Sequence, residues 1–449
     1  MSILKINELA LELVKRDFSD GHKPTNGGPT KTSRALALIH LAAHDAYAKV
    51  TGKLTPQLAT LPNKPAAIGT DEVTGIAALL GAGIRAAVQL YPDDAAFIAT
   101  EAAKIIATGT NAIALRYGEQ VADAWLNERK NDGSALPQED TLFDRAPGRH
   151  RRDPLNPKQT TLGRTWGLVK PFVLKDVVAD AYLAPPPALN TVEYAKAFDE
   201  VIDIGRDSII RGGTDARRNA TVGIFWGYDG SNKLGTPPRL YNRVVLAIPA
   251  VLALPHDRQV KLLTAINVAM ADAGIAAWYW KYEYDFWRPV VGIREADQGW
   301  GPTGKGDGNT HRQKGDPFWL PLGAPKSNPI APEKPTSIAE NSNFTPNFPA
   351  YPSGHATFGS ACFEVVAAFL GKKPEDITVQ DFVSSEFNGE TTDNTGATRP
   401  RLVETFTLRK AIEDNKISRI YLGVHWSFDA TGGQKVGNDV AAKVVAAFK

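Results

Sequence analysis

The stretch Phe348-Pro-Ala-Tyr-Pro-Ser-Gly-His355 leads directly into an apolar, helix-forming run at 356–370. It predicts a tight turn followed by a helix, whose first backbone N–H groups lack partners and carry partial positive charge. These N–H groups, the Ser353 hydroxyl and the Gly354 amide can therefore hold one oxyanion, with His355 beside it as a proton donor or acceptor. Because Pro-Ser-Gly is also an ordinary way to start a helix, this interpretation depends on the rest of the chain.

Upstream of this turn the chain reads Lys281-Tyr-Glu-Tyr-Asp-Phe-Trp-Arg288-Pro289. We predict a helix over 258–287 that Pro289 stops, with Lys281 and Arg288 two turns apart on one face and the guanidinium near the helix end. A solvated basic stripe is the plainer alternative. The neighbouring Tyr282 and Trp287 disfavour it, because large aromatic side chains are unusual around a surface face.

Downstream, the chain reads Arg419-Ile-Tyr-Leu-Gly-Val-His425-Trp-Ser-Phe-Asp429. His425 and Asp429 are an i, i+4 pair, so the carboxylate can hold the imidazole Nδ1–H and leave Nε2 free as a nucleophile or ligand. Arg419 adds a bidentate donor for an anion. The three stretches together supply the groups of a tetrahedral-oxyanion site with a nucleophile and an acid.

This set resembles the signature shared by the type 2 phosphatidic acid phosphatase superfamily and the vanadium-dependent haloperoxidases. That signature reads Lys-x6-Arg-Pro, then Pro-Ser-Gly-His, then Ser-Arg-x5-His-x3-Asp, and the chain carries all three parts in order at 281–289, 352–355 and 418–429. The surrounding residues are similar to the vanadium chloroperoxidase branch at 271–275, 286–289, 316–319, 348–359 and 417–430. The first half of the chain matches more vaguely.

The resemblance implies a vanadate cofactor whose metal is bonded to His425, with phosphate able to occupy the same site. The anion oxygens would be held by Lys281, Arg288, Ser353, Gly354 and Arg419. In that family Asp429 supports His425, His355 assists proton transfer and Lys281 polarises peroxide. Asp229 corresponds to a buried carboxylate that pairs with an active-site arginine, although its Gly-flanked position also fits a plain Asx turn. Phe348 and Trp278 would line the halide pocket, unless they are ordinary core aromatics.

The expected reaction is oxidation of halide, chloride or bromide, by hydrogen peroxide to hypohalous acid, with a small organic molecule as a further substrate. A soluble acid phosphatase would use the same residues, with His425 attacking phosphorus and His355 protonating the leaving alcohol. The motifs fit both enzymes. A non-catalytic anion-binding helical protein is the third alternative, disfavoured because every catalytic position of the signature is filled.

Composition narrows the class of protein. The chain has 449 residues, 43% hydrophobic and 22% charged, which is typical of a globular protein with ample core. The net charge of +2 is spread along the chain, so we expect no nucleic-acid or anionic-membrane partner. Cys362 is the one cysteine in the sequence. Charged residues interrupt the apolar residues of 1–20, so this segment lacks the continuous apolar core of a signal peptide. The sequence has no run of 18 consecutive apolar residues. We therefore expect a cytoplasmic protein without internal disulfides or a membrane span.

Helical periodicity dominates the chain and alternating β patterns are few, so the predicted fold class is all-α. We predict helices at 1–20, 33–50 with Ser33 as N-cap, 71–90, 93–108, 111–131, 191–210, 241–254 and 439–448, and long loops at 299–347 and 381–400. The irregular segment 132–187 separates an N-terminal half, 1–190, from a C-terminal half, 191–449, that carries the site. The resemblance implies two four-helix bundles packed into one compact unit.

Two groups of residues are predicted to be structural. His40 and His44 share a helix face, but no third ligand follows at metal-site spacing, so we predict hydrogen bonds between helices there instead of a metal site. The basic cluster within 145–152 is interpreted as a solvated loop face; its members are Arg145, Arg149, His150, Arg151 and Arg152.

Overall fold

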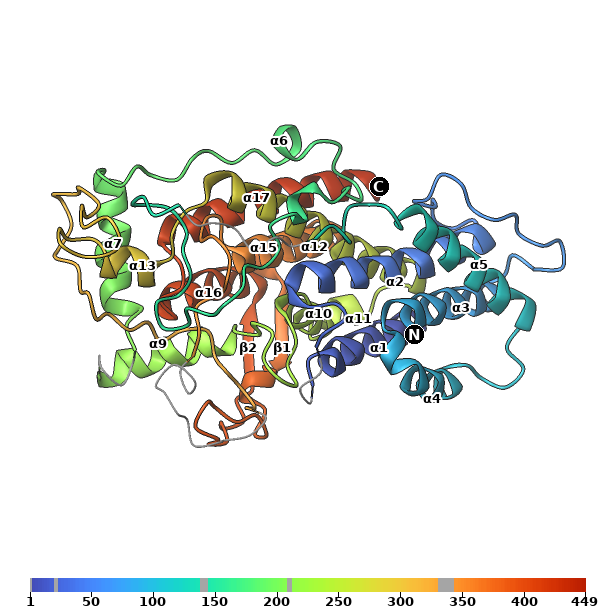
Figure 1. The fold of residues 1–449 in the computed structure, drawn as a ribbon. Coiled ribbons are helices and arrows are strands. Elements are labelled where there is room, and N and C mark those ends of the chain that lie inside the picture. Colours follow the sequence, from blue (N-terminus) through green and yellow to red (C-terminus); the bar gives the residue numbers. More distant parts are fainter. Residues whose placement is uncertain (1, 20–22, 138–143, 208–211, 330–342) are drawn as a thin grey trace.

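The computed structural model describes residues 2–19, 23–137, 144–207, 212–329 and 343–449. Its regular secondary structure is almost entirely helical, which confirms the all-α prediction (Figure 1). The α-helices are α1 (Ser2–Asp17), α2 (Gly28–Thr51), α3 (Glu72–Leu90), α4 (Ala95–Ile105), α5 (Ala112–Glu128), α6 (Val177–Asp180), α7 (Val192–Ile204), α9 (Gly213–Phe225), α10 (Pro237–Leu246), α11 (Pro249–Leu252), α12 (His256–Tyr284), α13 (Pro289–Arg294), α15 (Gly354–Leu370), α16 (Leu408–Tyr421) and α17 (Ser427–Ala447). Short 3-10 turns lie at η1 (Pro92–Asp94), η2 (Trp166–Leu168), η3 (Pro374–Asp376) and η4 (Ser385–Phe387).

Helix α12 lies at the centre of the molecule. On one side it packs against α2, which itself packs with α3 and α5; on the other it packs against α15 and α17, with α16 and α10 beside them (Figure 1). Its residues from Gln259 to Lys281 are almost all buried, because apolar side chains on every face of a helix require neighbours on every face. The position of α12 brings Trp278 and Lys281, near its C-terminal end, into the interior.

A small hairpin was not predicted. Strand β1 (Thr378–Phe382) pairs antiparallel with β2 (Glu404–Thr407), and the predicted loop 381–400 is the connection between them. The strands are four and five residues long and only Val379 and Phe382 of β1 are buried, so they leave little periodic signal in the sequence.

The predicted start of the second helix is wrong. Helix α2 begins at Gly28 and not after Ser33, because Pro29 occupies its first turn, where a missing N–H costs nothing. Ser33 is buried inside the helix, and its hydroxyl donates to the Thr30 carbonyl at 2.8 Å.

The predicted end of the central helix is also wrong. Helix α12 stops at Tyr284, where Asp285 adopts a left-handed conformation with φ 49°, and Pro289 starts α13 instead of ending α12. The segment between these helices pairs with an earlier loop, since the His150 amide donates to the Asp285 carbonyl at 2.8 Å. Arg288 therefore does not share a helix face with Lys281; it lies at the N-cap of α13.

Other boundaries differ in smaller ways. The predicted helix 93–108 is η1 followed by α4, 241–254 is the end of α10 followed by α11, and 439–448 is only the second half of α17. The predicted helices 1–20 and 191–210 and the predicted loop 299–347 each include residues outside those that the structure describes.

The histidine prediction in α2 is wrong in its details. His40 Nδ1 contacts the Leu36 carbonyl at 2.7 Å and His44 Nδ1 contacts the Asp45 carboxylate at 2.8 Å, so both partners belong to α2 itself and not to another helix. Within the described ranges, no group of three or more His, Cys, Asp or Glu residues could hold a metal ion.

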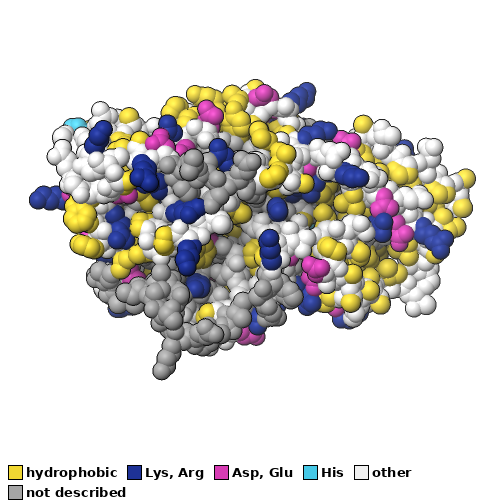
Figure 2. Space-filling model, viewed as in Figure 1, with side chains coloured by type: hydrophobic (Ala, Val, Ile, Leu, Met, Phe, Trp, Pro, Cys, Tyr) yellow, Lys and Arg dark blue, Asp and Glu magenta, His cyan; other side chains and the backbone are white. Residues whose placement is uncertain are grey.

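The molecular surface carries mixed charge. Figure 2 shows basic and acidic side chains scattered among apolar ones on the face in view. Helices α3 and α12 are long and apolar enough to cross a membrane, but 61% of the apolar window in α3 and 94% of that in α12 are buried inside the protein. Packing between helices therefore accounts for the apolar character of α12.

Candidate active site

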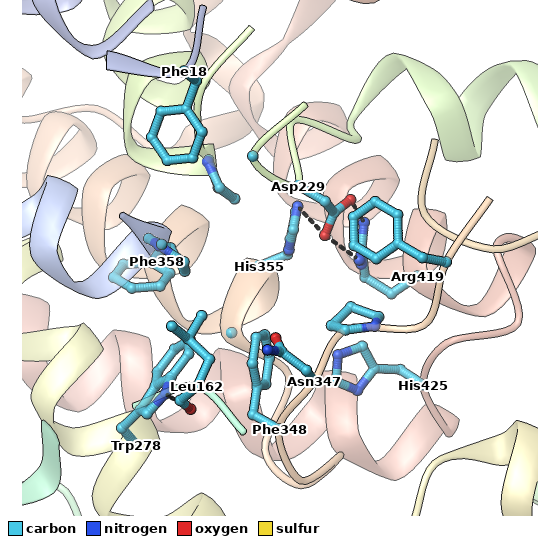
Figure 3. Close-up of a pocket in the computed structure, with 17 residues that line it drawn as sticks. Phe18, Leu162, Asp229, Trp278, Asn347, Phe348, His355, Phe358, Arg419 and His425 are labelled. Carbon is cyan, nitrogen blue, oxygen red and sulfur yellow. Dashed lines mark hydrogen bonds and ion pairs between the residues drawn. The ribbon is translucent and has the colours of Figure 1, made fainter. Parts of the chain in front are cut away.

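A cavity of about 160 Å³ brings together Gly354 and His355 of the second motif and Arg419 and His425 of the third (Figure 3). Apolar side chains, among them Phe18, Leu162, Trp278 and Phe358, line one side of it, while Asp229, Arg419 and His425 line the other. The remaining lining residues are Gly28, Pro29, Gly230, Pro237, Phe344, Pro346, Asn347, Phe348, Gly354 and His355. The cavity thus offers an apolar wall and a charged wall to one small molecule.

His425 lies just before α17 and is held in one tautomer. Arg288 Nη1 lies 2.9 Å from His425 Nε2, and because a guanidinium can only donate, Nε2 must carry the lone pair. The ring proton therefore lies on Nδ1, which donates to Asp429 Oδ2 at 2.8 Å. The same carboxylate oxygen accepts the Trp426 amide at 2.9 Å in the first turn of α17. Burial lowers the pKa of His425 well below its usual value, so the imidazole is neutral.

Three buried cations surround this imidazole: Lys281, Arg288 and Arg419 are each at most 1% exposed. Burial and mutual repulsion lower the pKa of Lys281 well below its usual range and that of Arg288 to about 9. Arg288 Nη2 and Arg419 Nε, both buried, have no hydrogen-bond partner among the described residues. Buried N–H groups left over around a cationic cluster fit a tetrahedral oxyanion, which would supply both acceptors and negative charge.

Asp229 is the carboxylate that faces these cations. It accepts two hydrogen bonds from Arg419, at 2.8 and 3.0 Å, and its Oδ1 lies 4.0 Å from His355 Nε2 (Figure 3). The pairing with an arginine that we expected of Asp229 is therefore present, and a plain Asx turn does not describe this residue.

His355, in the first turn of α15, is fixed at both its ring and its backbone. Its Nε2 donates to the Gly227 carbonyl at 2.7 Å, which leaves the lone pair on Nδ1. Its own carbonyl accepts from the Tyr241 hydroxyl at 3.1 Å and from Asn415 Nδ2 at 2.9 Å. Burial and the Arg419 charge lower the pKa of His355 to about 3, so the ring is a neutral proton acceptor.

Lys281 and Ser353 occupy the turn that the sequence placed at the centre. The Lys281 ammonium donates to the carbonyls of Pro349, at 2.8 Å, Ala350, at 3.0 Å, and Pro352, so it clamps the segment that leads into α15. Ser353 is the N-cap of α15, and its hydroxyl accepts the Ala356 amide at 3.5 Å. Neither side chain lines the cavity; both hold the loop that does.

Trp278 and Phe348 form the aromatic wall beside the cations. Their ring centroids are 4.8 Å apart, and Lys281 Nζ lies 5.6 Å from the first and 5.1 Å from the second. Arg288 Cζ lies 4.9 Å from the Phe348 centroid. Both aromatic residues line the cavity, so the structure brings the predicted halide-pocket pair together.

Several lining residues were missed from the sequence. Phe18 and Leu162 come from the N-terminal half, far from any motif, and no local pattern marks them. The prediction for the basic cluster at 145–152 is wrong for His150: Arg145 and Arg149 are exposed, but His150 is only 4% exposed. Burial, with the charges of Arg288 and Lys281, lowers the pKa of His150. His150 therefore lies behind the cationic cluster and not on a solvated face.

Comparison with known proteins identifies related sequences. A family model described as the VCPO second helical-bundle domain matches residues 261–449. The curated vanadium chloroperoxidase of Curvularia inaequalis is 30% identical, over 97% of this chain and 80% of its own length.

Solved structures show the same fold. The first bacterial vanadium-dependent iodoperoxidase has a TM-score of 0.68 at 21% identity and covers 100% of this chain and 96% of its own. A holo-type bacterial vanadium-dependent chloroperoxidase has a TM-score of 0.63 at 18% identity, covering 96% of this chain and 95% of its own. With a curated relative at 30% identity across nearly the whole chain, this protein belongs to the vanadium chloroperoxidase family.

Proposed function

We propose that this protein is a vanadate-dependent haloperoxidase that oxidises halide with hydrogen peroxide to hypohalous acid. The observation that carries the proposal is the arrangement around His425, where a neutral Nε2 lone pair lies among three buried cations. Two of these cations have N–H groups without a partner among the residues that the structure describes. A site of this kind is destabilised by its own positive charge until an anion binds. Family membership supports vanadate as that anion.

The residues that would hold vanadate are His425 through Nε2, Arg288 and Arg419 through their free N–H groups, the Gly354 amide, Ser353 and Lys281. When bound, vanadate supplies a Lewis-acidic centre that activates peroxide toward attack by halide. Arg288 Nη1 donates to the lone pair of His425 Nε2, so on binding of the anion this N–H would turn from His425 to an anion oxygen. Lys281 would likewise have to exchange a carbonyl partner for the anion.

The proton chemistry falls to His355. His355 lines the cavity, and its Nε2–H bond to Gly227 keeps the ring in the tautomer whose proton-accepting lone pair is on Nδ1. Asp429 holds the complementary tautomer at His425. Trp278 and Phe348 exclude water from the aromatic wall, which leaves a halide there poorly hydrated and therefore more reactive.

The test is peroxide-dependent halogenation of a phenolic dye by protein loaded with orthovanadate, with chloride and bromide in separate reactions. Turnover should require vanadate and fall as phosphate is added, because both anions use one pocket. Aryl-phosphate hydrolysis by vanadate-free protein is measured in parallel. Phosphatase turnover that vanadate does not suppress, without any halide oxidation, would replace this proposal with the acid phosphatase.

Two histidine variants separate the assigned roles. His425→Ala should lose both vanadate binding and turnover, by on the order of a thousandfold or more, because it removes the Nε2 ligand. His355→Ala should lose turnover but keep more of the vanadate affinity. His311→Ala is the control, since His311 is an exposed histidine outside the cavity. Equal losses of vanadate affinity in the first two variants would contradict these roles.

A further inference from the structure

A buried carboxylate lies outside the cavity and is not used in the proposed reaction. Glu386, in η4, is fully buried. Its Oε2 accepts from the Ser327 hydroxyl at 2.6 Å and from Arg399 Nη1 at 2.7 Å. Both donors bind Oε2, so these two hydrogen bonds leave the other carboxylate oxygen, Oε1, without a contribution from Arg399 or Ser327.

The other oxygen, Oε1, faces the turn that carries Asp229. A methyl group placed on Gly227 would lie 3.1 Å from Oε1, which puts this oxygen against the Gly227 backbone. Burial raises the pKa of Glu386 to about 7, against the Arg399 charge, the Ser327 hydroxyl and the Tyr228 amide, which lower it. The Tyr228 amide therefore points toward the carboxylate, but its geometry falls short of a full hydrogen bond. In the part of the chain that the structure describes, Oε1 has no hydrogen-bond partner.

The turn at 225–229 needs outside support. Tyr228 adopts a left-handed conformation with φ 59°, which is unfavourable for a residue with a bulky side chain. The segment beside Glu386 supplies this support at two further points. The Ser384 hydroxyl donates to the Phe225 carbonyl at 2.7 Å, and the Ser385 amide donates to the Tyr228 hydroxyl.

The same turn sets the position of the acid–base histidine. The Gly227 carbonyl accepts a hydrogen bond from His355 Nε2–H. Asp229 binds Arg419 and lies 4.0 Å from the His355 ring. A small movement of this turn would therefore change which nitrogen of His355 carries the proton, and with it the availability of Nδ1.

We propose that Glu386 is a positioning residue for His355, acting through the Gly227–Asp229 turn that it supports. The carboxylate binds Arg399 and Ser327 with one oxygen and presents the other, as an acceptor, to the Tyr228 amide. This keeps the Gly227 carbonyl aimed at His355 Nε2. The inference rests on the proposed function, because the tautomer of His355 affects turnover only if this histidine transfers a proton.

Glu386→Gln tests the idea with almost no change in volume. Because Ser327 and Arg399 both donate to one side, the amide oxygen must take that side and the amide NH₂ must face the Tyr228 N–H. Two donors then oppose each other, so the turn should shift. We expect kcat for halide oxidation to fall on the order of tenfold with vanadate affinity retained, as is common when a supporting hydrogen bond is lost.

The ¹⁵N spectrum of His355 in vanadate-free protein shows which ring nitrogen carries the proton. A purely structural role of Glu386 would leave this spectrum unchanged. Wild type should show the Nε2–H tautomer, and Glu386→Gln a mixture of both tautomers. Asp132→Asn is the matched control, because Asp132 is a buried carboxylate bound by Arg34, at 2.8 Å, and Arg129, at 3.0 Å, away from the cavity. It should lower stability and leave His355 and kcat unchanged.

Ser327→Ala is a milder second variant, which removes one donor to Oε2 and should shift the His355 spectrum in the same direction. Folded Glu386→Gln and Ser327→Ala proteins with a wild-type His355 spectrum would overturn the proposal, as would an equal loss of kcat in Asp132→Asn. If Glu386→Gln does not fold, the Ser327→Ala spectrum decides alone. Wild-type protein without halide oxidation would refute the proposed function instead, and the spectra would still report on the turn.

Discussion

Replacing Asp229 by asparagine should reveal how strongly the site depends on negative charge. The Asp229 side chain is 7% exposed and that of Arg419 1%, and two hydrogen bonds of 2.8 and 3.0 Å join them. The variant keeps the shape but leaves the guanidinium without its counter-charge. Breaking a buried ion pair in this way costs about 3–5 kcal/mol.

Thermal unfolding measures this loss. At roughly 2.1 cal/mol/K per residue, a chain of 449 residues unfolds with an entropy of about 0.9 kcal/mol/K, so the expected fall in Tm is about 3–5 °C. Saturating phosphate should narrow the gap between variant and wild type, because the bound anion offers Arg419 a new partner. Asp229 also raises the pKa of His355, so the variant should lower that pKa further.

Asp307→Asn is the control for this experiment. Asp307 is buried and receives two hydrogen bonds from Arg312, at 2.8 and 2.9 Å, but does not line the cavity. It should lose comparable stability, and phosphate should recover none of it. The reasoning is refuted if phosphate stabilises both variants equally, or if Asp229→Asn melts with the wild type.

Three further changes test other parts of the structure. Burial lowers the pKa of His40 from 6.5 to about 4, so as the pH falls this histidine is protonated in the unfolded chain before it is protonated in the folded one. The free energy of unfolding therefore decreases below pH 6.5, by about 2 kcal/mol at pH 5. His40→Leu should lose that part of the acid sensitivity in denaturant titrations at pH 7 and 5. Gly437→Ala would place a Cβ 2.5 Å from the Thr357 carbonyl, forcing α17 away from α15 at a cost of about 1–3 kcal/mol by the same titration. Phe348→His should reduce kcat/KM for chloride more than for bromide, since a titrating imidazole would replace the apolar wall; an unchanged ratio would show that this wall does not set halide preference.

Sequence alone could locate most of the candidate site. The second and third motifs contain His355, Arg419 and His425, and these side chains do converge on one cavity. The i, i+4 spacing of His425 and Asp429 was enough to predict their hydrogen bond, because the contact is local.

Contacts between distant segments could not be predicted in this way. Arg288 reaches His425 only because Asp285 turns the chain out of α12, and an aspartate in a left-handed conformation has no reliable local signature. Phe18 lines the cavity and Glu386 lies beside the Gly227–Asp229 turn, but both are far from the motifs in sequence, so only tertiary packing places them there. Ser33 shows the opposite error, a good local N-cap signal overridden by a helix that begins earlier.

The central position of α12 has a consequence for how the protein unfolds. Because α12 packs against α2 on one side and against α15 and α17 on the other, neither set of helices can keep its core closed once α12 leaves. Calorimetry should therefore record a single cooperative transition, with calorimetric and van't Hoff enthalpies in agreement. The fragment 191–449 would expose to water the face of α12 that packs against α2. It should behave as an expanded globule without fixed side-chain packing, which binds a hydrophobic dye.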